Sequence, residues 1–196
     1  MNKYSPEEKF ILQKLEDELP GGLTYHGLHH TLDVLKSAIR IAREENVTAE
    51  EMKLLRIAVL YHDAGFAATY KNHEEKACEL VKDDLPGFGY TDEKIATICG
   101  MIMATKIPQD PHTLLEEIIC DADLDYLGRN DFYVISNTLY EEMKKYVHVH
   151  SEKEWYEIQK NFLEKHQYYT GFSRKKRAPQ KQQYLEEIRQ LLLSYD

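Results

Sequence analysis

The stretch from Leu54 to Gly65 constrains the fold of this chain most strongly, because it reads LLRIAVLYHDAG. A helix that is apolar on nearly every side is expected in the middle of a globule. His62 and Asp63 stand at the end of this helix and are therefore carried into the interior. An isolated buried carboxylate is very unfavourable, so Asp63 requires a cation, and a metal ion is the obvious candidate.

The length and charge of the chain limit the classes of function. Its 196 residues predict one domain, 1–196, with a sizeable core. The 25 Lys and Arg residues against 34 Asp and Glu give a net charge of -9, which argues against binding to a nucleic-acid polymer. Cys78, Cys99 and Cys120 form no C-x-x-C pair and have apolar neighbours, so buried free thiols in a reducing compartment are expected.

No segment predicts export or membrane insertion. Residues 1–18 are too charged for a secretory signal, and no apolar run approaches the ~20 residues of a membrane span. We therefore expect a soluble, cytoplasmic protein without a membrane partner. The sequence leaves its oligomeric state open.

Apolar residues recur at helical spacing along almost the whole chain, and no alternating strand pattern of useful length appears. The prediction is an all-α fold, a single compact helical bundle. One helix is expected from Tyr25 to Glu45, and Thr48 with Glu51 forms a capping box that starts the next. Further helices are expected after Ser5, from His73 to Lys82, after Thr91, up to Asp123, around 132–143 and after Ser151. Residues 173–196 are expected to form a C-terminal basic segment, 173–181, and a last amphipathic helix.

Four side chains from three predicted helices could share a metal ion: His30, the pair His62 and Asp63, and Asp123. A divalent ion takes nitrogen and oxygen donors from different elements and keeps positions open for water and substrate. Adjacent residues point about 100° apart on a helix, so His62 and Asp63 can share an ion only at a helix end. Gly65 is expected to loosen the backbone there.

Each of these residues also has a simpler explanation. A lone buried histidine is more often a hydrogen-bonded core residue. The three aspartates of CDADLD, at 121, 123 and 125, could simply form a solvated helix end. The metal hypothesis therefore depends on the set and not on any single residue.

The set resembles a known family. The strings YHGLHHTLDV at 25–34, YHD at 61–63 and ADL at 122–124 resemble the HD-domain metal-dependent phosphohydrolases, over roughly residues 20 to 170. The resemblance implies that His30, His62, Asp63 and Asp123 are metal ligands and that Asp63 can bridge two ions. It implies one or two divalent ions as cofactors, among Mn, Mg, Fe, Zn, Ni and Co.

The segment Y-H-x-x-x-H also looks like the cyclic-nucleotide phosphodiesterases of this superfamily, which implies that His26 is a general acid. The i, i+4 spacing predicts His26 and His30 on one helix face, about 6 Å apart at Cβ. However, Phe66 and Lys71 stand where the phosphodiesterases have His and Asn. The Glu-Asp pair of the alarmone hydrolases is also absent, so neither specialised activity transfers, and the chain is more similar to uncharacterised bacterial members.

His73 and Glu74 resemble a His-Glu pair of those bacterial members, and could support a second metal or orient its water. The alternative is a helix start favoured by the helix dipole.

We expect a metal-dependent hydrolase of phosphate esters, with His26 and Asp63 as catalytic residues and a metal-activated water. The expected partner is a small phosphorylated substrate, a nucleotide-like phosphomonoester or phosphodiester. Lys106, Arg174 and Lys175 are candidate phosphate contacts, against the alternative of a solvated loop. Two other classes stay open: an HD-type di-iron oxygenase, and a nucleotide-binding module without catalysis.

Overall fold

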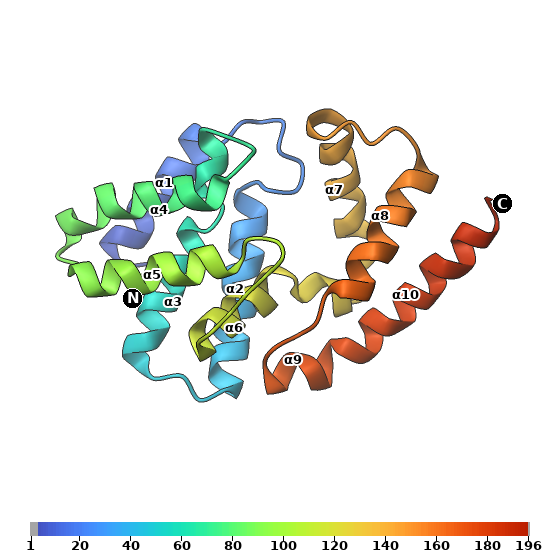
Figure 1. Cartoon of the computed structure of the whole chain (residues 1–196). Helices are drawn as coiled ribbons and strands as arrows, with labels where there is room; N and C mark the ends of the chain where they lie inside the picture. Colours follow the sequence, from blue (N-terminus) through green and yellow to red (C-terminus); the bar gives the residue numbers. More distant parts are fainter. Residues whose placement is uncertain (1–3, 196) are drawn as a thin grey trace.

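Helices make up the whole framework of the computed structural model, which describes residues 4–195 (Figure 1). The outermost residues of the predicted domain, 1–3 and 196, lie outside this range. Between them the chain forms ten α-helices, three short 3-10 helices and no strand, so the predicted all-α fold is confirmed. The elements are α1 (Pro6–Glu18), α2 (Leu28–Glu44), α3 (Ala49–Tyr61), η1 (Ala64–Ala67), α4 (His73–Asp84), η2 (Leu85–Phe88), α5 (Asp92–Ala104), α6 (Leu114–Asp123), η3 (Asp125–Gly128), α7 (Phe132–Tyr146), α8 (Glu152–Lys165), α9 (Gly171–Lys176) and α10 (Ala178–Leu193).

Helix α3 lies in the core, as its composition predicts. From Ile57 to Tyr61 no side chain is more than 1% exposed. The predicted capping box at its start is present, since the Thr48 hydroxyl accepts the Glu51 N–H and the Glu51 carboxylate accepts the Thr48 N–H. The helix therefore delivers His62 and Asp63 to the interior. Within the described range, none of the helices combines the length and apolar character needed to cross a membrane.

Two groups of apolar side chains fill the interior on either side of α2. The larger group comes from α1 to α6, and the smaller comes from Tyr25, Leu124, η3, α7, α8 and α10. Figure 1 shows α2 between these parts, with α7, α8 and α10 on one side and α1, α3, α4 and α5 on the other. The C-terminal end of α6, which carries Asp123, lies where the two groups meet.

Two expectations about local structure were wrong. Helix α2 begins at Leu28 and not at Tyr25, because Gly27 is extended and the N–H groups of Tyr25 and His26 donate to the buried carboxylate of Glu142. The basic segment 173–181 is largely helical. The Thr170 hydroxyl accepts the N–H of Ser173 and starts α9, and α10 follows from Ala178.

Candidate metal centre

Three helices bring the four predicted ligands to one point. His30 comes from the first turn of α2, His62 and Asp63 follow the last residue of α3, and Asp123 ends α6. One ligand atom each from His30, His62 and Asp123 lie within 4.8 Å of one another. Asp63 Oδ2 lies 3.4 Å from His30 Nε2 and 3.3 Å from His62 Nε2. His30 Nε2 is 3.0 Å from Asp123 Oδ1.

The hydrogen bonding of His62 leaves a lone pair facing this point. His62 Nδ1 lies 2.7 Å from the carbonyl oxygen of Val59 and must donate to it, so in the neutral ring that a metal ligand requires, Nε2 carries the lone pair. Within residues 4–195, neither His62 Nε2 nor Asp63 Oδ2 has a hydrogen-bond partner, although both are buried. A nitrogen lone pair and a carboxylate oxygen facing each other at 3.3 Å are stabilised by a cation between them. Two imidazoles and two carboxylates fit a divalent metal ion.

The pKa shifts of the clustered carboxylates also favour a positive charge at this point. Burial raises the pKa of Asp63, but His62 and His73 more than offset this effect and hold that pKa well below its usual value. Burial likewise opposes ionisation of Asp123, and the imidazoles of His30 and His62 lower its pKa. Burial lowers the pKa of His62, whereas Asp63 and Asp123 raise it more strongly, well above its usual value. Two ionised carboxylates in a buried site favour a positive charge beside them.

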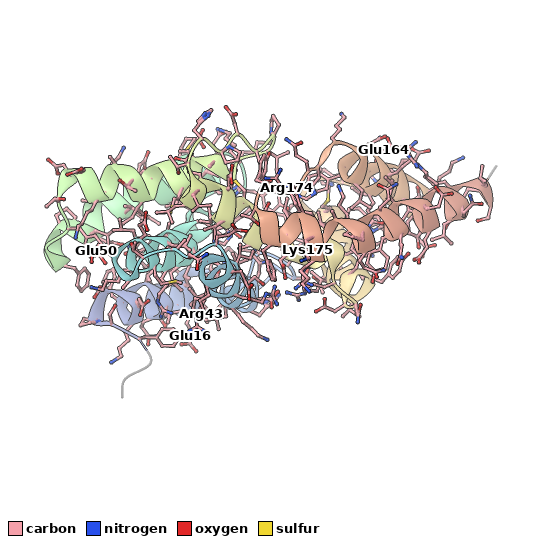
Figure 2. All side chains as sticks on the ribbon, turned by 90° about the horizontal axis from the view of Figure 1, so that it is seen from below. Glu16, Arg43, Glu50, Glu164, Arg174 and Lys175 are labelled. Atoms are coloured by element: carbon pink, nitrogen blue, oxygen red, sulfur yellow. The ribbon has the colours of Figure 1, made fainter. Side chains whose placement is uncertain are left out.

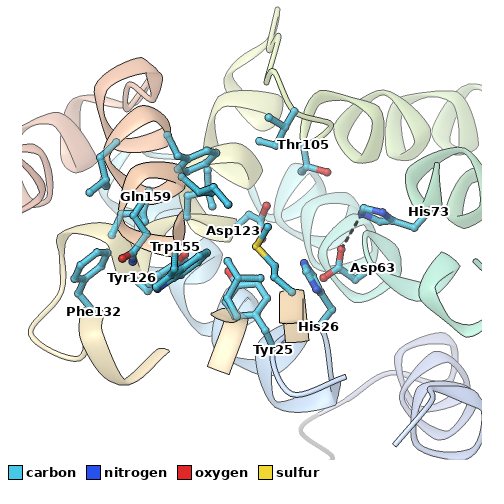
Figure 3. A pocket seen from close by; sticks show the side chains of 18 of the residues that line it. Tyr25, His26, Asp63, His73, Thr105, Asp123, Tyr126, Phe132, Trp155 and Gln159 are labelled. Carbon is cyan, nitrogen blue, oxygen red and sulfur yellow. Dashed lines mark ion pairs between the residues drawn. The ribbon is translucent and has the colours of Figure 1, made fainter. Parts of the chain in front are cut away.

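Asp63 has a second neighbour on its other oxygen. Asp63 Oδ1 lies 3.4 Å from His73 Nε2 (Figure 3), and His73 Nε2 lies 3.5 Å from Glu74 Oε1. The two oxygens of Asp63 thus face different groups, which suits a carboxylate that bridges two ions. The backbone of Asp63, at φ -102° and ψ 4°, lies in the bridge region where active-site residues are frequent.

Gly65 has a different role from the one expected. A Cβ atom at Gly65 would lie 1.9 Å from the carbonyl oxygen of His73, so a glycine is needed for close packing and not for a loose backbone. This contact joins η1 to the start of α4. It thereby places His73 next to Asp63.

His26 lies beside the cluster, although it precedes α2 and the helical i, i+4 argument for its position was wrong. Its ring centroid is 5.9 Å from that of His30. Phe66 stacks on two imidazoles, 4.3 Å from the ring of His26 and 3.9 Å from that of His73, and the two imidazole centroids lie 6.3 Å apart. The phenylalanine that departs from the phosphodiesterase pattern therefore packs against both histidines.

Glu142 is a functional candidate that the sequence analysis missed. It is fully buried in α7, and its Oε1 lies 2.5 Å from His26 Nδ1 and accepts the Tyr70 hydroxyl at 3.2 Å. Its Oε2 accepts the N–H groups of Tyr25 and His26 at 2.8 and 3.1 Å. Burial raises the pKa of Glu142, but the hydrogen bond from His26 outweighs this and lowers it. One signal was present: Glu142 falls seven residues after Ile135, on the apolar stripe of its helix.

A cavity of about 260 Å³ adjoins the cluster and includes His26, Asp63, His73, Glu74 and Asp123 in its lining. A divalent ion at its edge, next to an imidazole, could activate water for attack on a molecule held in the cavity.

The three predicted phosphate contacts, Lys106, Arg174 and Lys175, are absent from the cavity lining, although Lys106 lies between two lining residues, Thr105 and Ile107. Lys106 pairs with Glu75. The guanidinium of Arg174 donates to the carbonyl oxygen of Tyr169, and Lys175 is exposed on the same short helix (Figure 2). Their role toward phosphate stays a prediction.

Comparisons with known proteins agree with this geometry. A family model described as HD domain matches residues 27–125. A crystal structure of a predicted HD-superfamily hydrolase from an uncultured Thermotogales bacterium is 21% identical, with a TM-score of 0.64, and the match covers 97% of this chain and 94% of the other. A protein of Lactobacillus plantarum is 14% identical, with a TM-score of 0.67 and coverage of 96% and 95%. At these identities the two structures show a shared fold. A search of curated proteins finds no match.

Proposed function

The chain belongs to the HD-domain family, and from this premise we propose that it is a metal-dependent phosphohydrolase that cleaves a phosphate ester. One observation carries the proposal. The unpartnered atoms His62 Nε2 and Asp63 Oδ2 face each other, and Asp63 lines a cavity that His26 also lines.

In the proposed mechanism, His30, His62, Asp63 and Asp123 would hold the metal ion. A bound divalent ion lowers the pKa of its water to about 7 and polarises a phosphoryl oxygen. His26 serves as the general acid. Because its Nδ1 is held by Glu142, proton donation to the leaving oxygen uses Nε2.

His73 and Glu74 complete the proposed site. Next to Asp63 Oδ1, they would support a second ion or orient the attacking water. Nucleotide-like phosphomonoesters and phosphodiesters are the substrates that the family resemblance predicts.

The test is phosphate release from a panel of phosphomonoesters and phosphodiesters, nucleotides included, by protein loaded separately with Mn²⁺, Mg²⁺ and Fe²⁺. We expect turnover that stops when the metal is chelated. His26→Ala should retain its metal and turn over more slowly, most severely with poor leaving groups. The matched control is His29→Ala, whose side chain is absent from the cavity lining and should leave turnover unchanged. Bound metal without hydrolysis of any ester would refute the proposal.

The same protein separates the two alternative classes. Asp63 has His30 next to one carboxylate oxygen and His73 next to the other, an arrangement that would also suit two irons. Anaerobically purified, iron-loaded protein is therefore tested for oxygen uptake. Oxygen consumption during turnover would favour an oxygenase. Nucleotide binding without turnover would favour a binding module.

A further inference from the structure

The cavity continues from the metal centre into a region lined almost wholly by apolar side chains. Its walls come from η3, α7 and α8, and include Tyr126, Phe132, Met143, Trp155, Phe162 and Leu163. Figure 3 shows Phe132 and Gln159 at the opposite end from Asp63 and His73. The apolar side of α7 therefore faces this empty space in part, whereas in a close-packed core other side chains would cover it.

Charged groups are confined to one end of this space. The described lining residues include no Lys or Arg, and the carboxylates and imidazoles among them all belong to the metal centre. A charged group at the far end would be removed from water without a partner, which is strongly unfavourable. The single place for an anionic group of a bound molecule is therefore the metal end.

One polar group at the far end lacks a partner. Gln159 is 7% exposed and lines the cavity, and its Nε2 donates to Ser136 Oγ at 2.6 Å. In the described part of the chain, its Oε1 is buried without a hydrogen bond. Because Gln159 lines the cavity, a rotation of its side chain would bring this oxygen to a donor on a bound molecule, which would stabilise it.

We propose that the ester hydrolysed at the metal centre carries a single phosphate and a compact, uncharged, aromatic or aliphatic group, and that a hydroxyl or N–H at its far end donates to Gln159. This inference rests on the proposed phosphohydrolase function and specifies its substrate class. The volume sets the size of the group: about 260 Å³ equals roughly nine times the ~30 Å³ that one water occupies in the liquid. That is room for roughly ten non-hydrogen atoms, such as one substituted ring. The several hydroxyls of a nucleoside would find few partners among these walls.

The experiment compares kcat/KM of the metal-loaded full chain for four monoesters: phenyl phosphate, 4-(hydroxymethyl)phenyl phosphate, 4-carboxyphenyl phosphate and a nucleoside 5′-monophosphate. The carboxylate makes its phenol a better leaving group, so chemistry alone predicts faster cleavage of that ester. We expect the opposite, a loss of about 100-fold or more relative to phenyl phosphate, because the cavity rejects the charge. The nucleotide should also fall below phenyl phosphate; since its alkoxide is a poorer leaving group than phenoxide, only equal or faster cleavage of the nucleotide decides, and it decides against the inference.

The role of Gln159 is tested by Gln159→Leu. Wild-type protein should prefer the hydroxymethyl ester over phenyl phosphate by about tenfold, the effect of roughly one hydrogen bond, and the variant should lose this preference. Gln182→Leu, at an exposed glutamine of α10, should keep it.

The outcomes separate this inference from the function on which it rests. Hydrolysis of any of the four esters supports the phosphohydrolase. Equal or faster cleavage of the carboxylated ester, or of the nucleotide, overturns the inference and leaves the function standing. Absence of hydrolysis from all four monoesters overturns the inference, and the phosphohydrolase function falls with it only if the phosphodiesters of the panel are not hydrolysed either.

Discussion

The substitution Glu142→Gln tests how the protein positions His26, the proposed general acid. The carboxylate receives four donors, two on each oxygen: the N–H groups of Tyr25 and His26 on one, and His26 Nδ1 and the Tyr70 hydroxyl on the other. Glutamine has the same shape but keeps only one acceptor oxygen. At most two of the four donors can still be satisfied, and the others face an amide NH₂ group.

The size of the effect follows from this count. Each hydrogen bond to a charged acceptor contributes about 1.5–3 kcal/mol, and the Tyr70 hydroxyl can rotate to accept from the new amide. We therefore expect the free energy of unfolding to fall by about 2–4 kcal/mol. Loss of the carboxylate also frees the ring of His26, and a positioned general acid contributes about 10²–10⁴ in rate, so kcat should fall about 100-fold.

Urea unfolding, steady-state kinetics and metal analysis on the same preparation measure these effects. The matched control is Glu141→Gln, because Glu141 is exposed and pairs with Lys144 at the surface. A positioning role predicts normal metal content and a kcat loss that is smaller for 4-nitrophenyl phosphate, whose leaving group needs little protonation. A kcat within threefold of wild type, or an equal loss for good and poor leaving groups, would refute the reasoning.

Three further predictions concern charge. Asp125→Asn should lower the free energy of unfolding by about 3 kcal/mol in urea denaturation, because the buried Asp125 carboxylate lies within 3.5 Å of three arginines and its negative charge would no longer balance theirs. Burial lowers the pKa of His166 to about 3. Between about pH 6.5 and pH 3, His166 is therefore protonated in the unfolded chain but neutral in the folded protein. The free energy of unfolding from this source is fully present above about pH 6.5 and is lost as the pH falls toward 3. Between pH 8 and pH 5, the free energy of unfolding of the wild type should fall by about 2 kcal/mol more than that of His166→Gln. An equal loss in both proteins would contradict the assignment. Reversing the charges of Arg174 and Lys175 together should leave KM unchanged if neither contacts substrate, as their absence from the cavity lining indicates, whereas a large rise in KM would support the phosphate role.

The sequence predicted what depends on local pattern. The buried helix before His62, the capping box at Thr48 and the end of a helix at Asp123 all follow from composition and spacing over a few residues, and the structure confirms them. These local features, with the motif, were enough to identify the four side chains that the structure brings together.

The aspartates of CDADLD show what a local sequence pattern cannot predict. The simple alternative, a solvated helix end, is wrong, because Asp121 and Asp125 are at most 1% exposed. Asp121 accepts the N–H groups of Tyr169 and Thr170, whereas Asp125 pairs with arginines from three other places in the chain. Each role is set by partners that are mostly tens of residues away, and spacing within the hexapeptide says nothing about them.

Glu142 illustrates the same limit. Its position on an apolar stripe was visible, but its partners, His26 and Tyr70, are more than 70 residues distant in sequence. The same long-range contact ends the predicted helix early, because the carboxylate takes the N–H groups of Tyr25 and His26 and so favours a non-helical entry to α2.

The central claim is that Asp63 and its neighbours hold a catalytic metal ion, and metal content measured together with turnover tests it most directly. After dialysis against Mn²⁺ and removal of free metal, wild-type protein and Asp83→Ala, a change at an exposed aspartate, should bind one or two ions per chain and release phosphate. Asp63→Ala, with unchanged circular dichroism, should bind none and release none. An Asp63→Ala protein that is fully active without metal would contradict the account.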